Sequence, residues 1–179
     1  MTDLLRHTRD ERGVHRITLT DPARFNVLSA DMLTQLAQAI AAVAGDDEAR
    51  VLVIAAEGKA FCAGHDLREM AAQTPAQHEA LFRQCSRVML SLAQLPVPVV
   101  AAVQGVAAAA GCQLVAQCDL AIAAQGTRFG VNGIDLGLFC ATPSVPLLRN
   151  VPWKAGLHML MTGDFAPADQ ALAMGLVSQ

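Results

Sequence analysis

Two stretches of small residues decide the fold of this chain, Phe61-Cys62-Ala63-Gly64-His65-Asp66-Leu67 and Gly105-Val106-Ala107-Ala108-Ala109-Ala110-Gly111-Cys112. The first follows the apolar run 51–56, and the second follows the apolar run 97–103. Each pattern predicts a buried strand that ends in a tight turn and opens a helix. The first N–H groups of a helix lack intrahelical partners, so both turns direct free amides above the strand ends. Two such turns side by side predict a two-donor oxyanion hole.

Around these turns, the chain alternates strands and helices. The apolar run 51–56 is typical of a parallel strand that is covered on both faces. Alternation over 16–19 predicts a half-exposed strand, and Ser29 is a suitable N-cap for a helix that follows it. Further helices are expected over 81–92, 110–117, 145–148, 155–161 and 167–173, with a short strand over 120–124. The sequence therefore predicts one α/β domain, residues 1–179, with mostly parallel strands and right-handed crossovers.

Composition narrows the class of protein. The chain has 179 residues, of which 53% are hydrophobic and only 4% aromatic, so an aliphatic core is expected. A net charge of −3 provides no broad basic surface for nucleic acid. No apolar stretch is long enough to span a bilayer, because charged residues or glutamines interrupt each one. Five cysteines, an odd number, favour reduced thiols and a cytoplasmic protein.

Several motifs stand in an order that resembles the crotonase superfamily, the enoyl-CoA hydratases and isomerases. They are FCAGHDL (61–67), the long segment 98–123, LMTGD (160–164) and MGLVS (174–178). The resemblance implies a crotonase-like spiral of ββα units that binds an acyl-CoA thioester as substrate or ligand, with no tightly bound cofactor. It also implies a homo-oligomer, a trimer or a hexamer. By position, the backbone amides of His65 and Ala110 would form the oxyanion hole.

Hydratases of this family handle water with two glutamates, and this chain has neither. Gln113 stands at the first position and Gly133 at the second. An amide does not titrate near neutral pH and glycine has no side chain, so ordinary hydration is expected to be weak. The segment 133–140 is similar to a divergent hydratase-domain subgroup that also lacks the second glutamate.

Other side chains offer partial replacements. Asp135 lies two residues beyond the vacant position and shares its face if the segment is extended, although a structural role is favoured. The His65 ring either enters the pocket mouth and titrates there or is a surface histidine. Cys112, near a helix start, is either a thiolate or, as we favour, an inert buried thiol. Asn132 and Gln113, with Gly133, line the expected substrate pocket and bind water or a carbonyl without moving protons.

The resemblance also implies a coenzyme A site. Arg24 and Phe25 would lie near its adenine and pantetheine, and Asp66, Leu67 and Arg68 along the adenine pocket. The two arginines would supply positive charge to phosphates. Alternatively, Asp66 caps a helix and each arginine is merely solvated. No metal site is expected, because the spacing of the remaining histidines is not that of a metal site, and they are interpreted as surface residues: His7, His15, His78 and His158.

Three other classes of protein compete with an acyl-CoA enzyme of altered acid–base chemistry. The main alternative is a non-catalytic acyl-CoA binding protein on the same fold. A serine peptidase is disfavoured because the run 108–111 has no serine, and a dinucleotide-binding protein because no G-x-G-x-x-G follows a strand. Family members usually continue beyond the position of Gln179 into a helical segment that covers the acyl pocket, so the sequence is expected to form the core alone.

Overall fold

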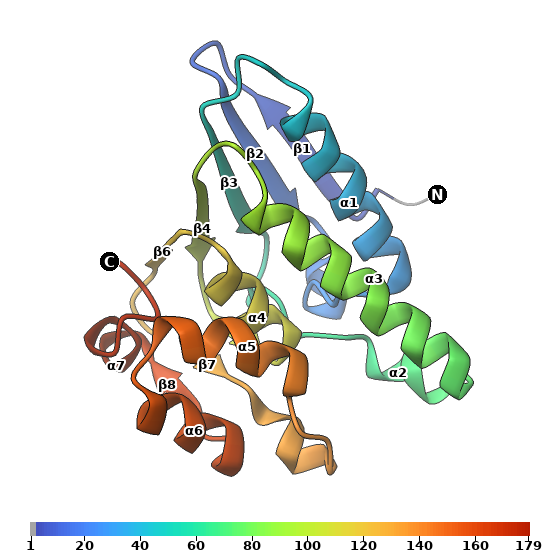
Figure 1. The fold of residues 1–179 in the computed structure, drawn as a ribbon, viewed down its shortest axis with the longest axis vertical. Coiled ribbons are helices and arrows are strands. Elements are labelled where there is room, and N and C mark those ends of the chain that lie inside the picture. Colours follow the sequence, from blue (N-terminus) through green and yellow to red (C-terminus); the bar gives the residue numbers. More distant parts are fainter. Residues whose placement is uncertain (1–2) are drawn as a thin grey trace.

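The computed structural model describes residues 3–179 and contains two sheets (Figure 1). In the five-stranded sheet the order is β1-β2-β3-β4-β6. Its parallel strands are β2 (Val14–Leu19), β3 (Val51–Ala56), β4 (Val99–Val103) and β6 (Leu120–Ala123), while β1 (Leu5–Arg9) pairs antiparallel with β2. The predicted parallel α/β architecture is therefore confirmed.

Two long helices cover one face of the large sheet. Figure 1 shows α1 (Ala30–Ala44) and α3 (Pro75–Ala93) side by side across it, and the two helices are in contact. Ser29 caps α1 as predicted, because its side chain accepts a hydrogen bond from the amide of Met32. A capping box on Thr74 opens α3. Among the described residues, no helix is both long and apolar enough to cross a bilayer.

A small second sheet carries the rest of the molecule. It has the order β5-β7-β8, where β5 (Val106–Ala108) is parallel to β7 (Arg128–Gly130) and β8 (Ala166–Pro167) is antiparallel to β7. The helical elements that complete the fold are η1 (Pro22–Arg24), α2 (Leu67–Ala71), α4 (Ala110–Gln117), η2 (Asn132–Leu136), α5 (Ala141–Asn150), α6 (Trp153–Thr162) and α7 (Ala168–Ala173).

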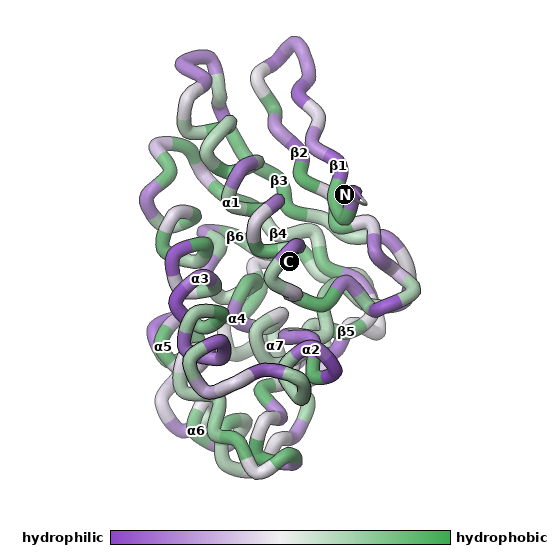
Figure 2. The backbone as a smooth tube through the Cα atoms, turned by 90° about the vertical axis from the view of Figure 1, so that its right-hand side faces the viewer, coloured by the Kyte–Doolittle hydropathy of each residue, from purple (hydrophilic) through white to green (hydrophobic). Residues whose placement is uncertain are grey.

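The two sheets are linked by repeated strand–strand–helix units. In β4-β5-α4 and again in β6-β7-η2, the first strand joins the large sheet and the second joins the small one. This is the spiral of ββα units that the family resemblance implies. In Figure 2 the β1–β2 turn is mostly hydrophilic, as are parts of the outer helices, whereas β3 and β4 are mostly hydrophobic. The core is mainly aliphatic, with Phe61 and Phe129 its fully buried aromatic rings.

His15 is buried, so its interpretation as a surface residue was wrong. It lies on β2 in the β1–β2 hairpin, and its Nδ1 atom is 3.0 Å from Nε2 of His7 on β1. The Nε2 atom is 2.9 Å from Oδ2 of Asp46, and Arg9 Nε is 2.7 Å from the same oxygen. Burial is possible because both ring nitrogens have hydrogen-bond partners, a pairing that histidine spacing does not reveal.

Acid should destabilise this hairpin. Burial and the neighbouring His15 lower the pKa of His7, so the unfolded chain binds its proton more readily. Stability should therefore be complete above about pH 6.5 and fall as the pH drops below it. Hydrogen bonds from the Glu48 amide and from His15 lower the pKa of Asp46. Stability should therefore fall further once the pH drops below the ordinary pKa of an aspartate.

The denaturation midpoint in urea, measured from pH 8 to pH 5, tests this expectation. Burial also lowers the pKa of His65, which adds to the loss in the wild type. His7→Gln keeps a donor for His15 and should flatten the pH dependence. His158→Gln, at an exposed site, is the control and should leave the dependence unchanged. A midpoint equally pH-dependent in wild type and His7→Gln would contradict the assignment.

Candidate active site

The two turns pack directly against each other. The amide of Ala108 donates to the carbonyl of Cys62 over 2.9 Å, within a parallel bridge between Cys62 and Ala107. A Cβ atom added to Gly111 would lie only 2.1 Å from the Cys62 oxygen, and one added to Gly64 would lie 3.2 Å from the Ala110 nitrogen. Only glycine permits this approach, which brings the ends of the two turns together.

The backbone N–H groups of His65 and Ala110 take no part in the backbone hydrogen bonds that join the neighbouring segments. Leu28 donates to the Gly64 carbonyl over 2.7 Å and forms a parallel bridge with His65, so the His65 N–H faces away from Leu28. Ala110 is the first residue of α4, whose initial amide lacks an intrahelical acceptor. Both residues line the same cavity.

Ala109 sets the direction of the second amide. Its φ of 48° and ψ of −117° are rare for alanine. The amide of Ala109 donates over 2.8 Å to the carbonyl of Gly130 at the end of β7. The hydrogen bond to β7 of the small sheet thus holds Ala109 in a strained conformation immediately before Ala110.

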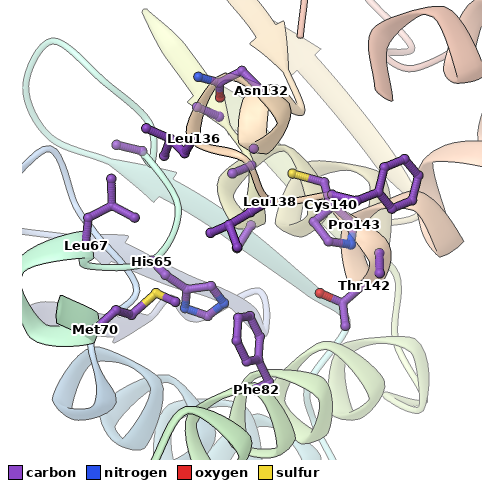
Figure 3. Close-up of a pocket in the computed structure, with 17 residues that line it drawn as sticks. His65, Leu67, Met70, Phe82, Asn132, Leu136, Leu138, Cys140, Thr142 and Pro143 are labelled. Carbon is purple, nitrogen blue, oxygen red and sulfur yellow. The ribbon is translucent and has the colours of Figure 1, made fainter. Parts of the chain in front are cut away.

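A mostly apolar cavity of about 510 Å³ lies over these turns (Figure 3). It is bounded by the turns, α2, α3, η2 and the start of α5. The lining residues are Ala63, His65, Leu67, Met70, Phe82, Ala108, Ala109, Ala110, Asn132, Gly133, Leu136, Leu138, Phe139, Cys140, Ala141, Thr142 and Pro143. An apolar chain with a polar head group at the amides fits such a site.

The ring of His65 belongs to the cavity wall. Its Nδ1 atom is 3.2 Å from the carbonyl oxygen of Leu28, an acceptor, so Nδ1 carries the proton in the neutral ring. The Nε2 atom is buried and has no hydrogen-bond partner. The ring meets that of Phe82 edge to face, with centroids 5.1 Å apart. Burial lowers the pKa of His65, so the ring is neutral at pH 7.

The two glutamate positions differ in their surroundings. Gln113 is buried on α4, one turn beyond Ala110, and its Oε1 atom has no partner, although the residue does not line the cavity. Gly133 does line the cavity, but a Cβ atom there would lie 2.6 Å from the Leu138 oxygen and 2.8 Å from Cys140 Sγ. The space for a side chain at position 133 is therefore filled. Asn132 lines the cavity beside it.

Asp135 is not among the residues that line the cavity. Asp135 would share the face of the vacant position only in an extended segment, and that condition is not met because the residue lies in the 3-10 helix η2. The side chain is exposed and lies against Gly163 at the end of α6, where an added Cβ would be 2.9 Å from Oδ1. This position supports the structural role that the sequence favours.

The candidate coenzyme A residues lie close to one another, next to the cavity wall at Leu67. Arg24 forms an ion pair with Asp66, whose side chain also accepts hydrogen bonds from the amides of Arg68 and Glu69 and caps α2. Burial opposes ionisation of Asp66, but the hydrogen bond from Arg24 and then those from the Glu69 and Arg68 amides outweigh it and lower the pKa of Asp66. Phe25 and Leu67 are about half exposed, at 52% and 51%. The positive charge of Arg24 is thus partly neutralised by Asp66, while the neighbouring Arg68 is exposed.

The thiols are buried. Burial raises the pKa of Cys112 to about 12, which makes it the inert thiol that the sequence favours. Sequence reasoning missed Cys140, whose sulfur accepts a hydrogen bond from the Gly133 amide, and Phe82, whose ring contacts His65. The sequence could have pointed to Phe82, because this residue lies on the apolar face of α3. Within residues 3–179, no three His, Cys, Asp or Glu side chains are arranged to hold a metal ion.

The ββα spiral, with an apolar cavity over two packed turns, defines a protein of the crotonase fold. The family model for enoyl-CoA hydratase/isomerase matches residues 9–179, and the chain belongs to that family. It is 46% identical to the mitochondrial enoyl-CoA hydratase domain-containing protein 3 of Rattus norvegicus, over 98% of this chain and 59% of the relative. The chain thus spans about 59% of the length of that curated relative.

Solved structures agree with this assignment. A crystal structure of an enoyl-CoA hydratase from Mycobacterium smegmatis superimposes with a TM-score of 0.96 at 54% identity, covering 98% of this chain and 69% of that one. Human enoyl-CoA hydratase domain-containing protein 3 superimposes with a TM-score of 0.93 at 43% identity, with the same coverage. The predicted crotonase-like fold is therefore confirmed.

Proposed function

We propose that the protein binds an acyl-CoA thioester and holds its carbonyl oxygen between the amides of His65 and Ala110. The observation that carries this proposal is the packing of the two turns, because it leaves both amides unpaired beside one apolar cavity. Negative charge that develops on the oxygen would be stabilised by the two donors and by the N-terminus of α4. The reaction class is therefore one that passes through a thioester enolate.

Hydration is proposed to be weak. Neither Gln113 nor Gly133 can exchange a proton, and no carboxylate is among the residues that line the cavity. The same observation favours a second candidate function, a non-catalytic acyl-CoA binding protein. In both cases the coenzyme is proposed to lie along Arg24, Phe25, Asp66, Leu67 and Arg68. A homo-oligomer, trimer or hexamer, and a cytoplasmic location stay predictions.

Binding can be measured without assuming turnover. Butyryl-CoA carrying ¹³C at its carbonyl should bind in a calorimetric titration more tightly than coenzyme A alone. Its carbonyl stretching frequency should fall on binding, because two hydrogen bonds polarise the C=O group. In a crystal of the complex, the thioester oxygen should lie within about 3.5 Å of both nitrogens. An oxygen farther than this from both, or an unshifted carbonyl band, would exclude the proposed hole.

A further inference from the structure

One wall of the cavity is formed by α3, and Phe82 is the α3 residue that lines it. Figure 3 shows its ring projecting from the helix towards the imidazole of His65. The two rings meet edge to face, with their centroids 5.1 Å apart and their planes at 80°. Phe82 is only partly buried, so its ring faces the cavity on one side and is accessible to solvent on another.

A second hollow lies on the outer surface of α3, next to the same ring. Its lining side chains follow one stripe of the helix, at spacings of three and four residues: Glu79, Phe82, Arg83, Ser86, Arg87 and Leu90. Of the residues that the structure describes, Phe82 alone lines both the cavity and this α3 hollow. The Phe82 ring is therefore the partition that separates the cavity from the outer surface of α3.

The proposed coenzyme residues and Phe82 lie on different sides of His65. Leu67 lines the cavity from α2, and in Figure 3 the His65 ring lies between Leu67 and Phe82. With the thioester at the His65 amide and the coenzyme at Leu67, the acyl chain extends away from α2 towards α3. None of the residues that line the cavity is an acid, a lysine or an arginine, so the wall suits an uncharged apolar chain.

We propose that Phe82 ends the acyl cavity and limits the length of the acyl chain that the protein accepts. This inference rests on the proposed function, since the two amides must hold the thioester for the chain to run in this direction. It names the substrate class as straight, uncharged acyl chains up to a limit set by one side chain. Phe82 is thus a specificity-determining residue and takes no part in proton transfer.

A series of saturated acyl-CoA thioesters, from butyryl-CoA to tetradecanoyl-CoA, tests this limit by calorimetric titration. Wild-type affinity should rise about 4-fold for each CH₂ group that is buried, and it should stop rising once the chain reaches the ring. Phe82→Ala removes the partition, so the rise should continue to longer chains. The ratio of tetradecanoyl-CoA to butyryl-CoA affinity should be at least about 16-fold greater in this variant, the value of two further buried CH₂ groups.

Two further variants make the comparison specific. Alanine favours a helix, so Phe82→Ala should keep α3. Phe82→Leu shortens the side chain less and should give an intermediate affinity ratio. Leu90→Ala is the matched control, because Leu90 lies on the same helix, is 56% exposed and lines only the α3 hollow. Its affinity ratio should equal that of the wild type. The ratio cancels any loss of affinity that is common to all chain lengths, which a merely structural role of Phe82 would produce.

The outcomes separate this inference from the proposed function. A ratio that rises in Phe82→Leu and again in Phe82→Ala supports the limit, and Phe82→Leu decides alone if Phe82→Ala does not fold. An unchanged ratio in the Phe82 variants overturns it, as does an equal rise in Leu90→Ala or a wild type whose affinity rises throughout the series. In those cases the thioester site survives, provided that butyryl-CoA still shows the shifted carbonyl band. An unshifted band in the wild type rejects both.

Discussion

Crotonyl-CoA should be hydrated at least about 100-fold more slowly by this protein than by family members that carry both glutamates. General acid–base catalysis typically contributes about 10²–10⁴-fold per group, and both groups are absent. His65 does not replace them, because its Nε2 atom is buried and out of contact with water. Loss of absorbance of the enoyl thioester, followed with micromolar protein, measures the rate. Turnover of about 10 s⁻¹ or more, the ordinary range of enzymes, would contradict the prediction.

Restoring the acids is harder than the sequence implies. Gln113→Glu is nearly isosteric, and alone it should not raise hydration, because each glutamate performs half of the proton handling. Pairing it with Gly133→Glu should restore the reaction by sequence reasoning, but the structure alters that expectation. The Leu138 carbonyl and Cys140 sulfur occupy the required space, so the double variant should be destabilised rather than active. A folded, active double variant would contradict this prediction and would show that segment 133–140 can change conformation to admit the side chain.

Gly111→Ala should cause a large loss of stability, because it acts at the contact between the two turns. The new Cβ would lie 2.1 Å from the carbonyl oxygen of Cys62, which is backbone and cannot rotate away. Overpacking a core typically costs about 1–3 kcal/mol, and contact with rigid backbone places this variant at or above about 3 kcal/mol. The urea denaturation midpoint, with the yield of soluble protein, measures the effect.

Gly45→Ala is the matched control, because its Cβ would meet the nearest oxygen at an ordinary 3.5 Å and its φ is −90°. Its midpoint should stay close to that of the wild type. Should Gly111→Ala unfold at the wild-type midpoint, the two turns would not be in the close contact described, and the shared site built on them would be lost.

Much of the fold could be predicted from periodicity. The strand 51–56 and the helix 110–117 were predicted with the bounds that the structure shows, because apolar runs and small-residue turns mark them clearly. β1 is mostly polar, and β5, β7 and β8 have two or three residues each. Elements this short are stabilised by pairing with distant strands, which a local pattern does not encode.

The site was predictable only in part. The turns around Gly64 and Gly111 follow from residue size, and the structure brings them together. The tautomer of His65 depends on a carbonyl 37 positions away, at Leu28, and the filling of the glutamate space by Cys140 depends on the coiling of η2. Both result from tertiary contacts. For the same reason, the sequence could not decide whether the segment around Asp135 is extended, and in the structure it is the 3-10 helix η2.

Ala109 gives the site an unusual dependence on the whole protein. Alanine does not choose a positive φ by itself, so the direction of the Ala110 amide is imposed by the Gly130 carbonyl at the end of β7. Local opening of the small sheet would let Ala109 relax and turn that amide aside while the large sheet stayed intact. Ligand binding at the proposed thioester site and global folding are then separate equilibria: heat or denaturant should disable that site first, in a molecule that still gives the spectrum of a folded protein.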